Sequence, residues 1–295
     1  MDAIFGIPLP ALLSQILLGL VNGSFYAMLS LGLAVIFGLL NVINFAHGVL
    51  YMLGAMLTWM GLSYFGLSYW VMLVLAPLIV GILAIAIERT MLRWLYQVDH
   101  MYSLLLTFGI TLVVEGLFRS VYGASGQPYS APEALTGGIN IGFMTLPMYR
   151  AWVVAVSVLV CLLTWFVIER TKIGSYLRAG TENPKLVEAF GINVPVMFTL
   201  TYAFGAGLAA LAGVLAAPVV QVSPLMGSNL TITVFAVVVI GGMGSIVGSV
   251  ITGLGLGVVE GMTRVFYPEL SSTVVFIVMA LILLVRPAGL FGKEN

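Results

Sequence analysis

Long apolar stretches alternate with short polar connections along the whole chain. An α-helix needs about 20 mainly apolar residues to cross the hydrocarbon core of a bilayer. Because a bilayer offers no partner for free backbone groups, helices are the usual way to span it. The pattern therefore predicts an all-α, polytopic bundle of transmembrane helices. The charge-poor stretches are Leu9–Leu40, 49–62, 67–87, 102–122, 152–168, 196–217, 230–259 and 271–285.

Two of these stretches are too long for one ordinary span. Leu9–Leu40 is interrupted by Asn22, Gly23 and Ser24, which fits one span plus a half-helix that continues into 41–48. The stretch 230–259 is broken by the glycines of 241–245, which fits a hairpin of two short helices. We therefore expect about eight spans, with broken or half-helices among them.

Composition excludes most soluble classes. Hydrophobic residues make up 61% of the 295 residues and charged residues 7%, against about 45–50% and about 25% in soluble domains. Eleven basic residues balance eleven acidic ones, so no basic field predicts a nucleic-acid partner. One cysteine and two distant histidines predict neither an internal disulfide nor a metal site. We expect one transmembrane domain over 1–295.

The distribution of Lys and Arg predicts how the chain crosses the membrane. The segment 169–195 holds four of the eleven basic residues, and the connection 88–100 holds Arg89 and Arg93. By contrast, 123–149 and 218–229 contain no Lys or Arg. Cytoplasmic loops carry the excess of Lys and Arg. The first two segments are therefore expected in the cytoplasm and the other two outside.

A short helix is predicted within the segment 169–195, over about two turns. Asn183 is a good N-cap, Pro184 suits the first helical position, and Gly191 suits a left-handed residue that ends the helix. So short a helix is marginal without a packing partner. It has an apolar side and a polar side, which fits packing on its own bundle, lying on lipid, or docking into a cytoplasmic partner. Its polar positions include Glu182, Lys185 and Glu188, and its apolar ones include Phe190.

A polar break lies between two apolar stretches. Asn41, Asn44 and His47 fall within eight residues. Unpaired polar groups at membrane depth are costly, so they usually face the bundle or a wet cavity. The break fits either the lining of a substrate path or internal hydrogen bonding.

Few other residues suggest chemistry. The pairs Glu115/Arg119 and Glu260/Arg264 are four residues apart and can each meet on one helix face. No row of deep carboxylates resembles a proton relay. No Gly-x-x-x-x-Gly-Lys-Ser/Thr stretch occurs, so any ATP hydrolysis takes place on another chain.

Taken together, these segments resemble the LivH-like permeases of branched-chain amino acid ABC importers. The resemblance covers nearly the whole chain and rests on the order and spacing of several short segments. These are 22–27, 43–48, 178–194, 213–215, 241–248 and the ending 286–290.

The resemblance implies a non-enzymatic subunit of the bacterial inner membrane that binds no cofactor itself. Its partners would be a LivM-like permease, two cytoplasmic ATPases that bind ATP and Mg²⁺, and a periplasmic substrate-binding protein. It also implies that the short helix couples to an ATPase through Glu182, Asn183, Pro184, Lys185, Glu188 and Phe190. Asn41, Asn44 and His47 would border the translocation path.

The substrate and some function classes stay open. Neutral or branched-chain amino acids rank first, and urea, a short amide or another small organic solute second. An ATP-independent secondary transporter or channel, and a structural scaffold, are the competing classes. The predicted docking helix and the missing proton relay favour the ATP-driven importer.

Overall fold

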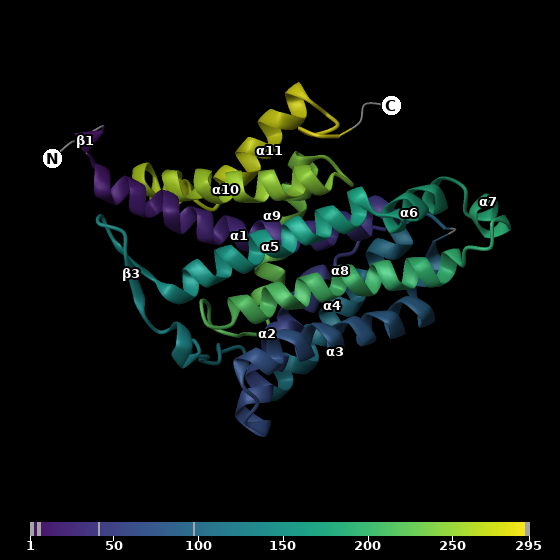
Figure 1. Cartoon of the computed structure of the whole chain (residues 1–295), viewed down its shortest axis with the longest axis horizontal. Coiled ribbons are helices and arrows are strands. Elements are labelled where there is room, and N and C mark those ends of the chain that lie inside the picture. Colours follow the sequence, from purple (N-terminus) through teal and green to yellow (C-terminus); the bar gives the residue numbers. More distant parts are fainter. Residues whose placement is uncertain (1–2, 5–6, 41, 97, 293–295) are drawn as a thin grey trace. The chain divides into compact units, whose positions relative to one another are not determined.

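The computed structural model describes residues 3–4, 7–40, 42–96 and 98–292, and these residues are mostly helical (Figure 1). Seven helices of this part are long and apolar enough to cross a membrane, and two apolar helices are shorter. The prediction of a polytopic helical membrane protein is confirmed. The long helices are α1 (Leu9–Leu40), α2 (His47–Phe65), α3 (Tyr69–Thr90), α4 (His100–Tyr122), α5 (Met148–Arg170), α8 (Val194–Ala216) and α10 (Ile246–Phe266); the shorter ones are α9 (Met226–Gly241) and α11 (Val274–Val285).

The expected interruption of the first stretch was wrong, since α1 runs unbroken from Leu9 to Leu40. The hydroxyl of Ser24 donates to the Leu20 carbonyl within the helix, at 2.9 Å. A Cβ at Gly23 would lie 2.9 Å from the carbonyl oxygen of Leu254, so this glycine lets α10 approach closely. The residues that look like a helix breaker are therefore packing positions. No half-helix continues α1, since 42–44 are irregular and 45–46 form a turn.

The second expected break is confirmed, but the expected hairpin of two short helices was wrong, since α10 is long enough to cross a membrane and only α9 is short. Helix α9 ends at Gly241 and α10 begins at Ile246. Gly242 and Gly244 between them have φ of 97° and 83°, a left-handed conformation that glycine adopts at little cost. The chain after α11 returns to this turn, where the Leu290 N–H donates to the Ile240 carbonyl at 2.8 Å.

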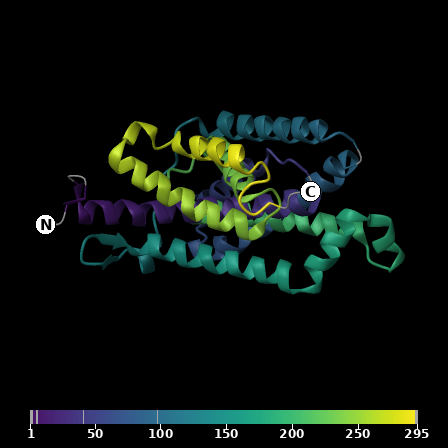
Figure 2. The ribbon, with the colours of Figure 1, turned by 90° about the horizontal axis from the view of Figure 1, so that it is seen from above.

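The remaining elements are short. The strands β1 (Ala3–Ile4) and β2 (Ile7–Pro8) pair antiparallel, as do β3 (Gly138–Asn140) and β4 (Thr145–Pro147). The β3–β4 hairpin leads into α5 (Figure 2). Between α5 and α8 lie α6 (Lys172–Glu182) and α7 (Pro184–Ala189); the sequence pattern did not predict α6. The 3-10 turns are η1 (Leu92–Leu95), η2 (Glu133–Leu135) and η3 (Pro268–Leu270).

The described residues group into two compact units, and the single-domain expectation stays a prediction. The first unit takes the described parts of 1–30, 131–161 and 233–295, and the second takes those of 31–130 and 162–232. In the first, Val237, Ile240 and Leu256 belong to a buried core. In the second, α8 packs along α2 and α3 (Figure 1). Small residues allow this close packing of the helices.

Candidate functional site

The two basic connections meet at one end of the second unit. Both contribute to the lining of a cavity of about 800 Å³, with Arg93 and His100 from one connection and Thr181 and Lys185 from the other. The Tyr96 ring of the first connection also meets the Phe198 ring at the start of α8 edge to face, with centroids 6.2 Å apart. The segments predicted to share the cytoplasmic side therefore lie together.

The two loops without Lys or Arg meet where α4 and α8 end. The Gln127 N–H donates to the Val222 carbonyl at 2.7 Å, and the Val222 N–H donates back at 3.1 Å. These loops follow α4 and α8, whereas the basic connections precede those two helices. The arrangement agrees with the expectation that basic and non-basic segments lie on opposite sides of the membrane.

The short helix α7 has the start and stop that the sequence predicts. The Asn183 side chain accepts the Leu186 N–H at 3.1 Å, and Pro184 is the first helical residue. Gly191 has a φ of 82°, the left-handed conformation expected just after a helix. The helix itself has 6 residues, fewer than the expected two turns.

The surface of α7 and its flanks is exposed. Of its apolar residues, Val187 is buried, while Leu186 and Phe190 point outward with 55% and 77% of their surface exposed. Such large exposed apolar side chains on a polar segment are typical of an interaction site. The other residues predicted to couple are also exposed, namely Glu182, Asn183, Pro184, Lys185 and Glu188.

The polar break is buried inside the second unit. Asn41 lies outside the described residues. Asn44 is fully buried and His47 is 2% exposed. The Asn44 side-chain oxygen accepts the Ala46 N–H at 3.1 Å, which supports the turn that leads into α2. The His47 ring lies against Gly32, where a Cβ would come within 3.0 Å of the imidazole.

A polar stripe on α4 supports this break and was not predicted. Ser103, Thr107, Thr111 and Glu115 are the buried residues of α4, each four positions after the last. Thr107 accepts the Phe45 N–H at 3.1 Å, so it satisfies a backbone group that the irregular segment leaves free. The spacing of four within an apolar helix was the signal that the sequence offered.

Replacing Thr107 with valine is expected to destabilise the fold by about 1–2 kcal/mol, because the Phe45 N–H loses its acceptor inside the bundle. The measurement is thermal unfolding of the purified protein in detergent. Thr58→Val is the matched control, since the buried Thr58 hydroxyl donates to the Gly54 carbonyl of its own helix and to no other described residue. Equal melting temperatures for the two variants would contradict this role of Thr107.

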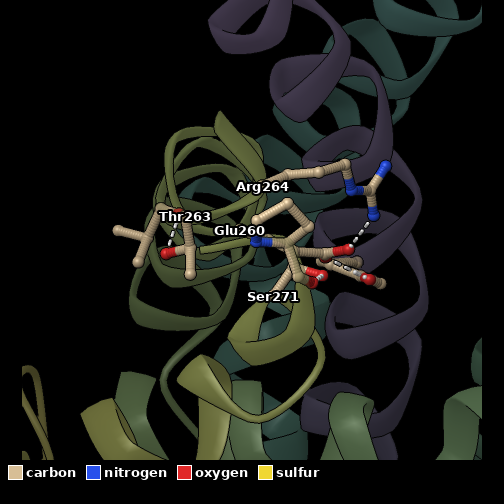
Figure 3. A network of polar contacts seen from close by, with 7 residues as sticks. Glu260, Thr263, Arg264 and Ser271 are labelled. Carbon is tan, nitrogen blue, oxygen red and sulfur yellow. Dashed lines mark hydrogen bonds and ion pairs between the residues drawn. The ribbon is translucent and has the colours of Figure 1, made fainter. Parts of the chain in front are cut away.

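Of the two charged pairs that the sequence predicts, one forms an ion pair and the other does not. Glu260 and Arg264 form an ion pair at 2.6 Å (Figure 3). The Tyr26 hydroxyl donates to the same carboxylate at 2.7 Å. The expected pairing there is confirmed. Glu115 instead accepts a hydrogen bond from the Ser228 hydroxyl. Among the described residues the ion pairs are Arg264–Glu260 and Arg178–Glu169, so the expected pairing of Glu115 with Arg119 was wrong.

Glu88 is a further buried polar residue that the sequence pattern did not predict. It lies in the last turn of α3 and is 1% exposed. Its carboxylate accepts the Tyr96 hydroxyl at 2.9 Å and the Thr199 hydroxyl at 2.6 Å. Burial, and then the nearby Glu88 carboxylate, raise the pKa of Tyr96 above its ordinary value.

Comparison with known proteins assigns the family. The family described as "Branched-chain amino acid transport system / permease component" matches residues 15–283. The chain belongs to this permease family. It is 30% identical to the permease protein LivH of the Escherichia coli K12 high-affinity branched-chain amino acid transport system, over 96% of both chains. It is also 30% identical to BraD of Pseudomonas aeruginosa, again over 96% of both chains. No solved structure matched it.

Proposed function

We propose that this chain is a permease subunit of an ABC importer that moves branched-chain or other neutral amino acids across a bacterial inner membrane. The observation that carries the proposal is the match to LivH and BraD over nearly the full length of each chain. In this proposal the chain catalyses no reaction and holds no cofactor. ATP and Mg²⁺ bind to separate ATPase subunits, whose hydrolysis drives transport.

The partners follow from the same assignment. A second, LivM-like permease completes the membrane channel, two ATPases bind at the cytoplasmic face, and a periplasmic protein delivers the substrate. The exposed apolar side chains of α3 and α4, such as Val74, Leu78, Leu105 and Leu117, face the lipid bilayer or the second permease. The exposed segment 182–190 contacts an ATPase through Glu182, Asn183, Pro184, Lys185, Glu188 and Phe190.

The polar break is proposed to border the route of the substrate. Asn41, Asn44 and His47 offer neutral hydrogen-bonding groups, which suit a solute that must be released again. Asn44 and His47 are buried in the described conformation. The route would therefore open at the break only when the helices around it move.

Uptake of labelled leucine tests this function. Deleting the gene for this chain from its host should abolish high-affinity leucine uptake, and a plasmid copy should restore it. Unlabelled isoleucine and valine should compete with the label, whereas urea and short amides should not. Competition by urea or acetamide alone would assign the permease to the other substrate class. Unchanged leucine uptake after deletion would contradict the amino-acid proposal.

A further inference from the structure

A buried carboxylate ties three separate segments together beside α7. Glu88 of α3 accepts hydrogen bonds from Tyr96, which follows η1, and from Thr199, in the second turn of α8. No ion pair of the described residues includes Glu88. The two hydroxyls therefore supply its polar contacts in a buried site. We name Glu88, Tyr96 and Thr199 the Glu88 clamp.

The hydrogen bonds of the clamp are strong because their acceptor is a buried carboxylate. A carboxylate removed from water is costly unless donors satisfy it, and hydrogen bonds to a charged group are stronger than neutral ones. Thr199 lies 2.6 Å from Glu88 and 3.0 Å from the carbonyl of Pro195, so the carboxylate is the nearer acceptor. Displacing α8 from α3 would break this contact and leave the carboxylate short of a donor.

One side of the clamp is connected to α7. Only residues 190–193 separate α7 from α8, and Asn193 caps α8 by accepting the Val196 N–H at 3.1 Å. Glu88 and Tyr96 also line the cavity of about 800 Å³ whose lining includes Lys185 and Glu188 of α7. Helix α7 is thus joined through residues 190–193 to the start of α8, where Thr199 lies.

The other side of the clamp is connected to the polar break. Tyr202 lies one helical turn after Thr199 on α8 and is 1% exposed. Its hydroxyl and the side-chain nitrogen of Asn44 are both buried, and neither has a hydrogen-bond partner among the described residues. A Cβ at Gly32 would lie 2.8 Å from the Gly205 carbonyl oxygen of α8 and 3.0 Å from the His47 ring, so α8 and the break both pack against Gly32. The break therefore lies within two helical turns of the clamp along α8, and both belong to the second unit.

We infer that the Glu88 clamp transmits the movement of α7 to the polar break, so that Glu88, Tyr96 and Thr199 are positioning residues for transport. This inference rests on the proposed function, because α7 moves only if an ATPase binds it. In the inferred step, α8 and the α3–α4 connection move together with α7. Helix α8 then shifts against Gly32 and so against the His47 ring of the polar break. Without the clamp, α7 would move while the break stayed closed.

The test is the number of leucine molecules imported per ATP hydrolysed, in proteoliposomes that contain the complete transporter and its binding protein. Thr199→Val should still retain the ATPases but lower this ratio about tenfold, because a hydrogen bond to a charged group is lost. Thr199→Ser, which keeps the hydroxyl, should restore it. Thr201→Val is the matched control, since within the described part of the chain the buried Thr201 hydroxyl bonds only to the Met197 carbonyl of its own helix.

Tyr96→Phe removes the other donor to Glu88 and keeps the aromatic ring. It should also lower the number of leucine molecules imported per ATP hydrolysed. This variant tests the clamp if the Thr199→Val transporter does not assemble. A normal ratio in the assembled variants would overturn the inference, even if less complex formed, because a purely structural contact changes the amount of complex and not its coupling. A wild-type transporter without ATP-driven uptake would overturn the proposed function and the clamp together. If the wild type and the variants all import the normal number of leucine molecules per ATP hydrolysed, the clamp inference is wrong and the proposed function stands.

Discussion

Replacing Phe190 with alanine should release the ATPase from the permease while the membrane bundle stays folded. Phe190 is 77% exposed at the end of α7, so its removal leaves no cavity in the protein's own core. A single buried aromatic often dominates a small interface, and its loss then costs about 2 kcal/mol or more. That corresponds to about 30-fold weaker binding of the ATPase.

Co-purification of the ATPase with the tagged permease measures this effect, together with substrate-stimulated ATP hydrolysis. Phe65→Ala is a matched control, because Phe65 is 75% exposed and ends α2, away from the basic connections. Only the Phe190 variant should lose the ATPase. If it retains the ATPase and couples hydrolysis to uptake normally, Phe190 is not an anchor.

Two exposed residues are expected to lie on opposite sides of the membrane, so a cysteine placed at each should be labelled from one side only. Ser130 lies in a loop without Lys or Arg, and Lys185 lies on α7. In a Cys161→Ala background, a cysteine at position 130 should react with a membrane-impermeant thiol reagent added to spheroplasts. A cysteine at position 185 should react only after the membrane is permeabilised, since basic segments stay in the cytoplasm.

The buried native thiol is replaced so that it cannot contribute to the signal; Cys161 is 4% exposed. Denatured samples of both variants should label equally, which shows that each cysteine is present and reactive. Labelling of position 185 from outside, with position 130 protected, would invert the topology and remove α7 from the reach of a cytoplasmic ATPase.

Local rules explain what the sequence predicted well. The ends of α7 depend on Asn183 and Gly191, whose roles are decided within a few residues. The break between α9 and α10 likewise depends on Gly242 and Gly244, which take conformations that other residues avoid. Such signals need no knowledge of the tertiary structure.

Contacts distant in sequence explain what the sequence did not predict. Gly23 lies inside α1 because a residue without a side chain lets α10 pack closely there. The sequence of α1 itself does not indicate that α10 is its neighbour. Glu88 looks like one more residue of a basic connection, yet Thr199, distant along the chain, turns it into a buried acceptor. The Glu115–Arg119 spacing fits a helix pair, but Ser228 supplies the observed partner of Glu115.

We expect this chain to work only within an ATP-driven importer. Leucine uptake is measured in proteoliposomes that hold the permease pair and the ATPases, with the binding protein on the substrate side. Uptake should require hydrolysable ATP and should stop with a non-hydrolysable analogue or without the ATPases. Leucine accumulation by this chain without ATP and without the ATPase subunits would show that transport is not driven by ATP.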